Sequence, residues 1–196
     1  GLTSYQNNGK DAVKRLVHLL DYLPLAIQTA KGFFLQNPFI DVTTYINENK
    51  FEEVANAVNV AIKSSLLRIL SRPEHACSLA IAALVDADSI PLDLFTVDES
   101  TQAVIDLYQW TIVRIVGKSN GDPVLSIHRM FQAAARGLLE EFKFRDIKLK
   151  ALKTILRTLE TKLLCFRRDD NSTWESRAEL VKHILSHLIF TYLFIR

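Results

Sequence analysis

Two groups of side chains have types and spacings that suit chemistry, and the first is a set of metal-ligand candidates. Glu179, His183 and His187 recur every four residues, so on a helix they would share one face and could clamp a metal ion. The metalloprotease pattern HExxH places a glutamate after its first histidine, whereas Ile184 stands there in this chain. Solvated or packed histidines are therefore the expectation, and no metal site is predicted.

The second group is Ser126 with His128, two residues apart, which raises nucleophilic catalysis. A serine nucleophile needs a base that is itself oriented by a third group, and it often stands on a sharp strand-to-helix elbow. Neither an orienting carboxylate nor an elbow motif accompanies this pair. No catalytic residue is predicted.

Nucleotide hydrolysis needs a phosphate-binding loop, in which the pattern GxxxxGK[ST] offers backbone N–H groups to phosphates. The one Gly-Lys pair is Gly9-Lys10, but Asp11 follows it and Ser4 stands where the first glycine belongs. No apolar strand precedes this pair. The chain is therefore not expected to act as an enzyme on its own.

The composition is that of an ordinary globular protein. The 196 residues are 48% hydrophobic and 23% charged, and the net charge of +2 gives no electrostatic case for nucleic-acid or membrane partners. Wholly apolar runs are far shorter than the roughly 20 residues that span a bilayer. Cys77 and Cys165 lack CxxC spacing and suit buried, reduced thiols in a cytoplasmic protein. Because the chain begins at Gly1 and its single methionine is Met130, we expect a piece of a longer protein.

Helical periodicity dominates the first 110 residues. Pro24 suits the first turn of a second helix, and Pro38 interrupts the pattern after that helix. Ser71-Arg72-Pro73-Glu74 predicts a capping box at the start of a later helix. The inner positions expected for these helices are Val13, Leu16, Val17 and Leu20, then Leu23, Ala26, Ile27, Ala30, Phe33 and Phe34, then Val54 to Leu70, then Ala76, Leu79, Ala80, Ala83 and Leu84, and finally Val104, Leu107 and Tyr108.

A β-hairpin followed by a helix is predicted next. Residues 111–116 are rich in β-branched side chains, residues 118–123 are dense in turn formers, and residues 124–128 alternate apolar with polar. Leu125 and Ile127 share one strand face, which leaves Ser126 and His128 aimed differently. The apolar positions after the hairpin follow a helical period and indicate a helix whose inner face carries Phe131, Ala134, Ala135, Leu138 and Phe142. A hairpin that feeds a helix, after earlier helical segments, is a winged-helix pattern.

The last part of the chain predicts a helical hairpin. Leu152, Ile155, Leu156, Leu159 and Leu163 form one stripe, and residues 167–173 are polar like a loop. From 188 to 195 the final segment is apolar all round except at Thr191. Because such a helix needs partners on every side, residues 144–196 are interpreted as the start of a repeat region.

Several motifs together resemble NB-ARC domains, the nucleotide-binding switches of STAND ATPases. Leu20 to Ala26, LDYLPLA, resembles the GLPLA stretch, and Ser126 to Gln132, SIHRMFQ, looks like the MHD motif in its "MHRLVQ" form, which precedes tetratricopeptide repeats. Pro91 to Phe95 is similar to a winged-helix "iP…lf" segment. Trp174 and residues 179–183 are similar to the "W…eLlpH" opening of a repeat region. The resemblance covers nearly the whole chain through the order and spacing of these motifs.

The resemblance implies a nucleotide-reading role. In that family the GLPLA proline lies near the adenine and the MHD histidine donates to the β-phosphate of ADP. The positions that match are Pro24, with Leu23 beside it, and His128. The alternatives left open are a histidine that only caps the next helix and a proline that only starts one. The cofactor implied is ADP or ATP in the intact parent protein, and tight binding to this fragment alone is not expected. Two residues depart from the pattern: Tyr22 replaces the glycine before Leu-Pro, and Arg129 replaces the MHD aspartate.

The interpretation is a mainly α protein with one small β-hairpin, in which a helical bundle precedes a winged-helix domain and a C-terminal helical hairpin. The expected units are a helical lid over 1–70, the winged helix over 71–143 and the hairpin over 144–196. The expected partners are an upstream P-loop domain of the same polypeptide and downstream helical repeats, without a membrane.

Three alternatives stay open. One is a helical protein–protein interaction module without nucleotide function. A second is a homo-oligomer through the apolar residues 180–196. DNA binding is disfavoured, because the reading-helix candidate at 100–110 has no Lys or Arg and the hairpin turn offers only Lys118.

Overall fold

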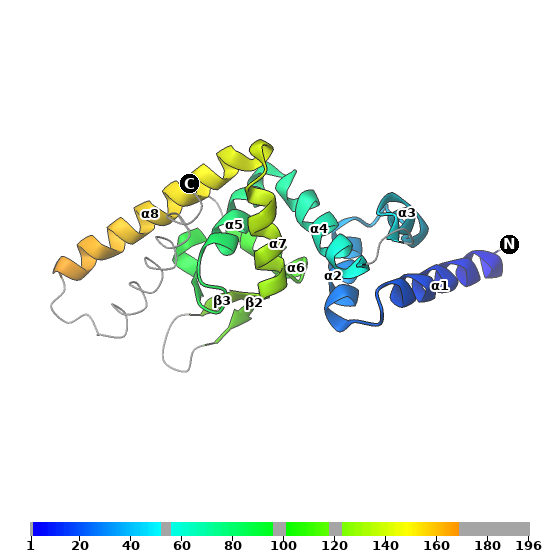
Figure 1. Cartoon of the computed structure of the whole chain (residues 1–196). Coiled ribbons are helices and arrows are strands. Elements are labelled where there is room, and N and C mark those ends of the chain that lie inside the picture. The colour runs from blue at the N-terminus through cyan, green and yellow to red at the C-terminus, as the bar shows by residue number, and fades with distance from the viewer. Residues whose placement is uncertain (1, 52–55, 96–100, 118–122, 169–196) are drawn as a thin grey trace.

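The computed structural model shows a mainly helical protein with one small antiparallel sheet. Its N-terminal part is built from α1 (Leu2–Leu19), α2 (Pro24–Gln36), α3 (Val42–Glu48) and α4 (Ala57–Leu70). In Figure 1, α1 projects away from the rest of the molecule at the N-terminal end, and α2 to α4 connect it to the sheet-bearing part. The residues that the structure describes are 2–51, 56–95, 101–117 and 123–168.

The following segment alternates helices with short strands. After α5 (Pro73–Leu84) come β1 (Ile90–Pro91) and the 3₁₀ turn η2 (Leu92–Phe95), followed by α6 (Thr101–Gln109). The β2 strand (Val113–Val116), the β3 strand (Val124–Ile127) and α7 (Arg129–Leu139) complete it. The sheet has the order β1-β3-β2, with Ile90 opposite Leu125 and Val113 opposite Ile127.

The chain then turns through η3 (Phe142–Phe144) into the long α8 (Arg145–Arg168), which crosses the sheet-bearing part along one edge (Figure 1). One continuous core runs from Leu16 to Leu159. Helix α5 lies at its centre, because most of its side chains are buried, and it packs against α6, α7 and α8. No helix in the described ranges is long and apolar enough to cross a bilayer.

The predicted hairpin is confirmed as the β2–β3 pair, but the expectation of a hairpin alone is wrong because β1 adds a third strand. This strand is two residues long and ends in Pro91, so it carries no alternating pattern that sequence could reveal. Pairing with β3 holds it in place.

The predicted capping box is also wrong. Arg72 is the N-cap of α5 and makes no side-chain cap bond, whereas the Ser71 hydroxyl donates to Arg68 O at 2.7 Å and belongs to the end of α4. Since only two residues separate α4 from α5, the serine is used by the helix that ends rather than the one that begins.

Most expected inner positions are buried or half-buried, but Val13, within α1, is 48% exposed. Other exceptions occur at element ends and within α8. Leu23 is the N-cap of α2, outside its helical face, and α7 ends before Phe142, so Phe144 is buried in its place. Tyr108 and Leu156 are exposed as well. The first helix begins at Leu2 rather than after a frayed lead-in, and α8 extends to Arg168, into the predicted loop.

Candidate functional site

The turn that leads to Pro24 uses two left-handed residues. The Tyr22 N–H donates to Val17 O at 3.1 Å and the Asp21 N–H to His18 O at 3.0 Å, which are the paired bonds of a Schellman motif. Asp21 and Tyr22 both have φ of 54°, a conformation that glycine adopts freely and other residues avoid. Position 22 is where the motif that this stretch resembles has glycine. The geometry gives a conformational reason for glycine there, and Tyr22 occupies the position with strain.

Helix α2 starts with an apolar and uncapped N-terminus. Pro24 occupies its first turn, as predicted, and Leu23 is an extended N-cap whose side chain offers no acceptor to the first-turn N–H groups. Tyr22 is 66% exposed and Leu23 is 45% exposed, and Pro24 is exposed beside them. This helix start therefore presents a flat apolar surface next to backbone donors.

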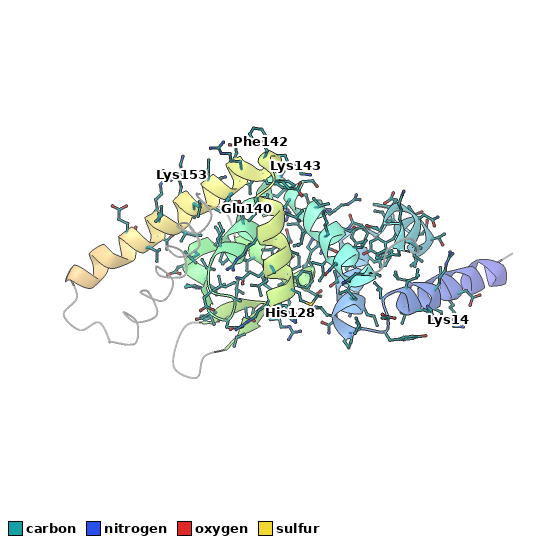
Figure 2. All side chains as sticks on the ribbon, in the orientation of Figure 1. Lys14, His128, Glu140, Phe142, Lys143 and Lys153 are labelled. Carbon is teal, nitrogen blue, oxygen red and sulfur yellow. The ribbon has the colours of Figure 1, made fainter. Side chains whose placement is uncertain are left out.

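His128 is the N-cap of α7. Its Nδ1 accepts from the Met130 N–H at 3.3 Å, so a neutral ring carries its hydrogen on Nε2. The side chain is exposed, and within the described residues Nε2 has no hydrogen-bond partner. Figure 2 shows His128 at the opposite end of α7 from Phe142. A capping role and a donor role toward a ligand are thus compatible, because each uses a different ring nitrogen.

The two helix starts are joined through the end of the sheet. The β2–β3 ladder ends at the pair Val113 and Ile127, one residue before His128. Two residues before Val113, the Thr111 hydroxyl donates to Gln28 O at 3.1 Å, one helical turn after Pro24. These contacts link neighbouring elements, and a single site that contains both Pro24 and His128 stays a prediction.

Arg129, the departure from the MHD pattern, forms a surface ion pair. Its Nη2 lies 3.1 Å from Asp88 Oδ2, and both side chains are largely exposed. Beside it lies a hollow of about 410 Å³. The lining consists of Val85, Asp86, Ala87 and Asp88 together with Arg129, Gln132, Ala133 and Arg136 of α7.

Two polar side chains of this hollow bind the C-terminal end of helix α5. Gln132 Nε2 donates to Val85 O at 2.8 Å, and Arg136 Nε donates to Ala83 O at 2.6 Å. These donors satisfy carbonyls that the helix end leaves without partners, and the guanidinium charge suits the negative end of the helix dipole. Burial lowers the pKa of Arg136 from its usual value. Gln132 and Arg136 therefore have a structural role at the end of α5.

A polar cluster between α5 and α6, formed around the buried His75, was not predicted. His75 is 8% exposed, and its Nε2 pairs with Asp106 Oδ2, while Gln102 Nε2 donates to Asp106 Oδ1 at 2.9 Å. Burial raises the pKa of the Asp106 carboxyl, but the hydrogen bonds from His75 and Gln102 and the charges of His75 and Arg72 outweigh it, and the net pKa is lowered. Sequence reasoning did not find this cluster, since nothing local in sequence pairs residues 31 positions apart.

Several predicted features lie outside the described residues. These are the turn residue Lys118, the segment with Trp174, the set Glu179, His183 and His187, and the apolar residues 180–196. The repeat-like hairpin and the oligomer surface therefore stay predictions. Comparison of the chain with protein-family models, with curated proteins and with solved structures finds no match.

Proposed function

We propose that this chain is the regulatory portion of an NB-ARC-type STAND switch, in which a helical lid and a winged helix help to hold ADP against an upstream P-loop domain. In this proposal the chain performs no catalysis itself. It controls a closed-to-open transition that exposes an oligomerising surface, which is a two-state population shift. Downstream helical repeats and a cytoplasmic setting belong to the same proposal.

The arrangement of elements supports the fold part of this proposal. Helices α1 to α4 fit a four-helix lid. The succeeding order of helix, short strand, 3₁₀ turn, helix and hairpin, in which β1 pairs with β3, fits a winged helix. Because the edge strand β1 comes from the Pro91 segment, the motif order noted in the sequence fits this arrangement as well.

The observation that carries the nucleotide part is the orientation of His128. Its Nδ1 is used by the cap of α7, which leaves Nε2–H as an exposed donor beside a helix N-terminus. An imidazole N–H and a helix N-terminus both favour a phosphate oxygen. The exposed apolar surface of Leu23 and Pro24 suits a base, and the Thr111 contact ties that helix to the His128 side.

Two variants of the full-length protein, which by this proposal carries the P-loop domain, separate the cap from the sensor. His128→Ala removes both the Met130 cap and the donor, whereas His128→Asp keeps a good cap acceptor and places negative charge near the phosphates. Both variants are expected to release ADP about tenfold faster or more, a loss of one strong hydrogen bond. Stopped-flow release of a fluorescent ADP measures this, and wild-type release rates in both variants would refute the sensor role.

The competing function is a helical interaction module. Phe39 is 100% exposed, Phe142 87% and Leu35 61%, and isolated apolar side chains of this kind are compatible with a docking surface or with an ordinary surface. A full-length protein that binds no ADP by calorimetry, yet forms a stable complex with a partner, would favour this function over the switch.

A further inference from the structure

One ridge of α2 packs against the end of α6, and the contact differs from the rest of the core. The ridge residues follow the helical spacing i, i+4 and i+8, so they lie in one row. We name this contact the α2 seam. It is formed by Gln28, Gly32 and Gln36 of α2 and by Gln109, Trp110 and Thr111 at the end of α6.

Gly32 allows the close approach at the centre of the seam. A Cβ atom at this position would lie 2.4 Å from Trp110 O and 2.8 Å from Trp110 C. Both are backbone atoms, so a side-chain rotation cannot relieve the overlap. The approach of α2 to α6 therefore depends on the absence of a side chain at position 32.

Closing the seam leaves two unfavourable features in place. Thr111 ends α6 in a Schellman motif with φ of 61°, a conformation that is a genuine outlier for a β-branched residue. Trp110 is 1% exposed, and its indole N–H has no hydrogen-bond partner within the described residues. A buried donor without a partner costs free energy that solvent access would recover.

Few polar bonds hold the seam against these costs. The Thr111 hydroxyl donates to Gln28 O at 3.1 Å, and Gln36 Nε2 donates to Gln109 Oε1 at 2.8 Å. Both bonds are exposed, so water can replace them. The rings of Trp110 and Phe33 also meet nearly at right angles, with ring centroids 6.1 Å apart, and this apolar contact adds to the attraction.

From this balance we infer that the α2 seam is a metastable latch between the helical N-terminal part and the sheet-bearing part. It opens far more readily than the core around α5 and lets water reach the Trp110 indole. Strained or unsatisfied groups persist where surrounding contacts over-determine them, and such places are typical of switch regions. The latch itself is argued from the seam alone, and its use as the opening contact of the switch rests on the proposed function.

Hydrogen exchange and tryptophan quenching of the 196-residue chain test the latch without nucleotide. In a Trp174→Phe background Trp110 is the only tryptophan, so acrylamide quenching reports its solvent access. Gly32→Ala should raise the quenching constant and speed amide exchange in α2 by about tenfold or more, while α5 and α7 amides keep their protection. The matched control is Gly137→Ala, since a Cβ there meets nothing within 4 Å, and it should change neither signal.

A second variant covers the case in which Gly32→Ala does not fold. Thr111→Ser keeps the hydroxyl that binds Gln28 O but removes the β-branch, so the closed seam should become more favourable and α2 exchange should slow by about twofold to threefold. Slowed exchange in α2 alone supports the latch. If α2 amides in the wild-type chain are as protected as those of α5 and α7, and the variants shift all three helices together, the seam is ordinary core packing and the inference is wrong.

Discussion

Two helix junctions in this protein are built in opposite ways. At the α5–α7 junction, Gln132 donates to Val85 O at 2.8 Å and Arg136 donates to Ala83 O at 2.6 Å, so side chains of one helix satisfy the carbonyl end of the other. At the α2 seam, the Trp110 indole N–H is buried without a partner in the described chain and Thr111 holds a left-handed conformation. Both junctions bury side chains, but of the two only the seam has a buried donor without a partner among the described residues.

The difference shows that burial alone does not decide how firmly two helices are joined. Apolar area stabilises both contacts, whereas an unsatisfied donor or a strained backbone reduces the net free energy of only one. A junction with satisfied groups has no open alternative of comparable free energy, so it stays closed until the domain unfolds. A junction with costs that solvent can relieve has such an alternative, and this is the physical requirement for a movable contact.

The largest expected effect comes from comparing the same change, glutamine to leucine, at each of the two junctions. Gln132→Leu removes the shorter and buried of the two hydrogen bonds to Val85 O, leaves only the Arg136 Nη2 donor at 3.3 Å, and should lower the free energy of unfolding by about 1.5 kcal/mol. Gln36→Leu removes an exposed bond at the seam and should change it by no more than about 0.5 kcal/mol. Urea unfolding followed by circular dichroism measures both. Equal losses would show that the two junctions do not differ as described.

The sequence predicted features that depend on neighbouring residues and missed contacts between residues far apart in the chain. Helical periodicity predicted the buried rows with Leu16, Ala26 and Leu79, because burial repeats along a helix with a fixed period. It could not predict that Gln132 reaches the end of α5, since the two are 47 residues apart and glutamine at that position also suits an exposed face.

Predictions about element ends were the least reliable. The Ser71 signal was real, but two helices compete for it, and a local pattern does not say which one uses it. Phe142 continued the α7 stripe in sequence, whereas the 3₁₀ turn that follows α7 changes the register and buries Phe144. Of the candidate site, sequence located Pro24 and His128 at helix starts; the exposed Nε2 and the strained turn at Tyr22 required coordinates.

A moderate effect is expected from the pH dependence of the α5–α6 contact, in which the Asp106 carboxylate pairs with His75 and accepts from Gln102. The folded-state pKa of Asp106 is lowered, so below the unfolded value of about 4 the unfolded chain binds more protons and stability rises with pH. The contribution of the carboxylate is therefore fully present above about pH 5 and is lost as the pH falls through the folded pKa. Asp106→Asn should lower the free energy of unfolding by about 1 kcal/mol at pH 7 and by progressively less toward pH 3.

Urea titrations at several pH values measure this difference, and Gln36→Leu serves as the control, because a seam bond between two amides has no titrating group. A gap between wild type and Asp106→Asn that stays constant from pH 7 to pH 3 would show that the carboxylate charge does not stabilise the α5–α6 contact.

The smallest effect concerns the backbone cost at Thr111, and a pair of variants isolates it. Thr111→Ala and Thr111→Gly both lose the bond to Gln28 O, but only alanine keeps the Cβ atom that disfavours φ of 61°. A left-handed residue costs about 1–2 kcal/mol, and the greater unfolded-state entropy of glycine offsets about 0.5–1 kcal/mol of the relief. Thr111→Gly should therefore exceed Thr111→Ala in free energy of unfolding by about 0.5–1 kcal/mol. If the Thr111→Ala variant is as stable as the Thr111→Gly variant, the backbone at position 111 carries no strain. The contrast between the two junctions then depends on the Trp110 indole alone.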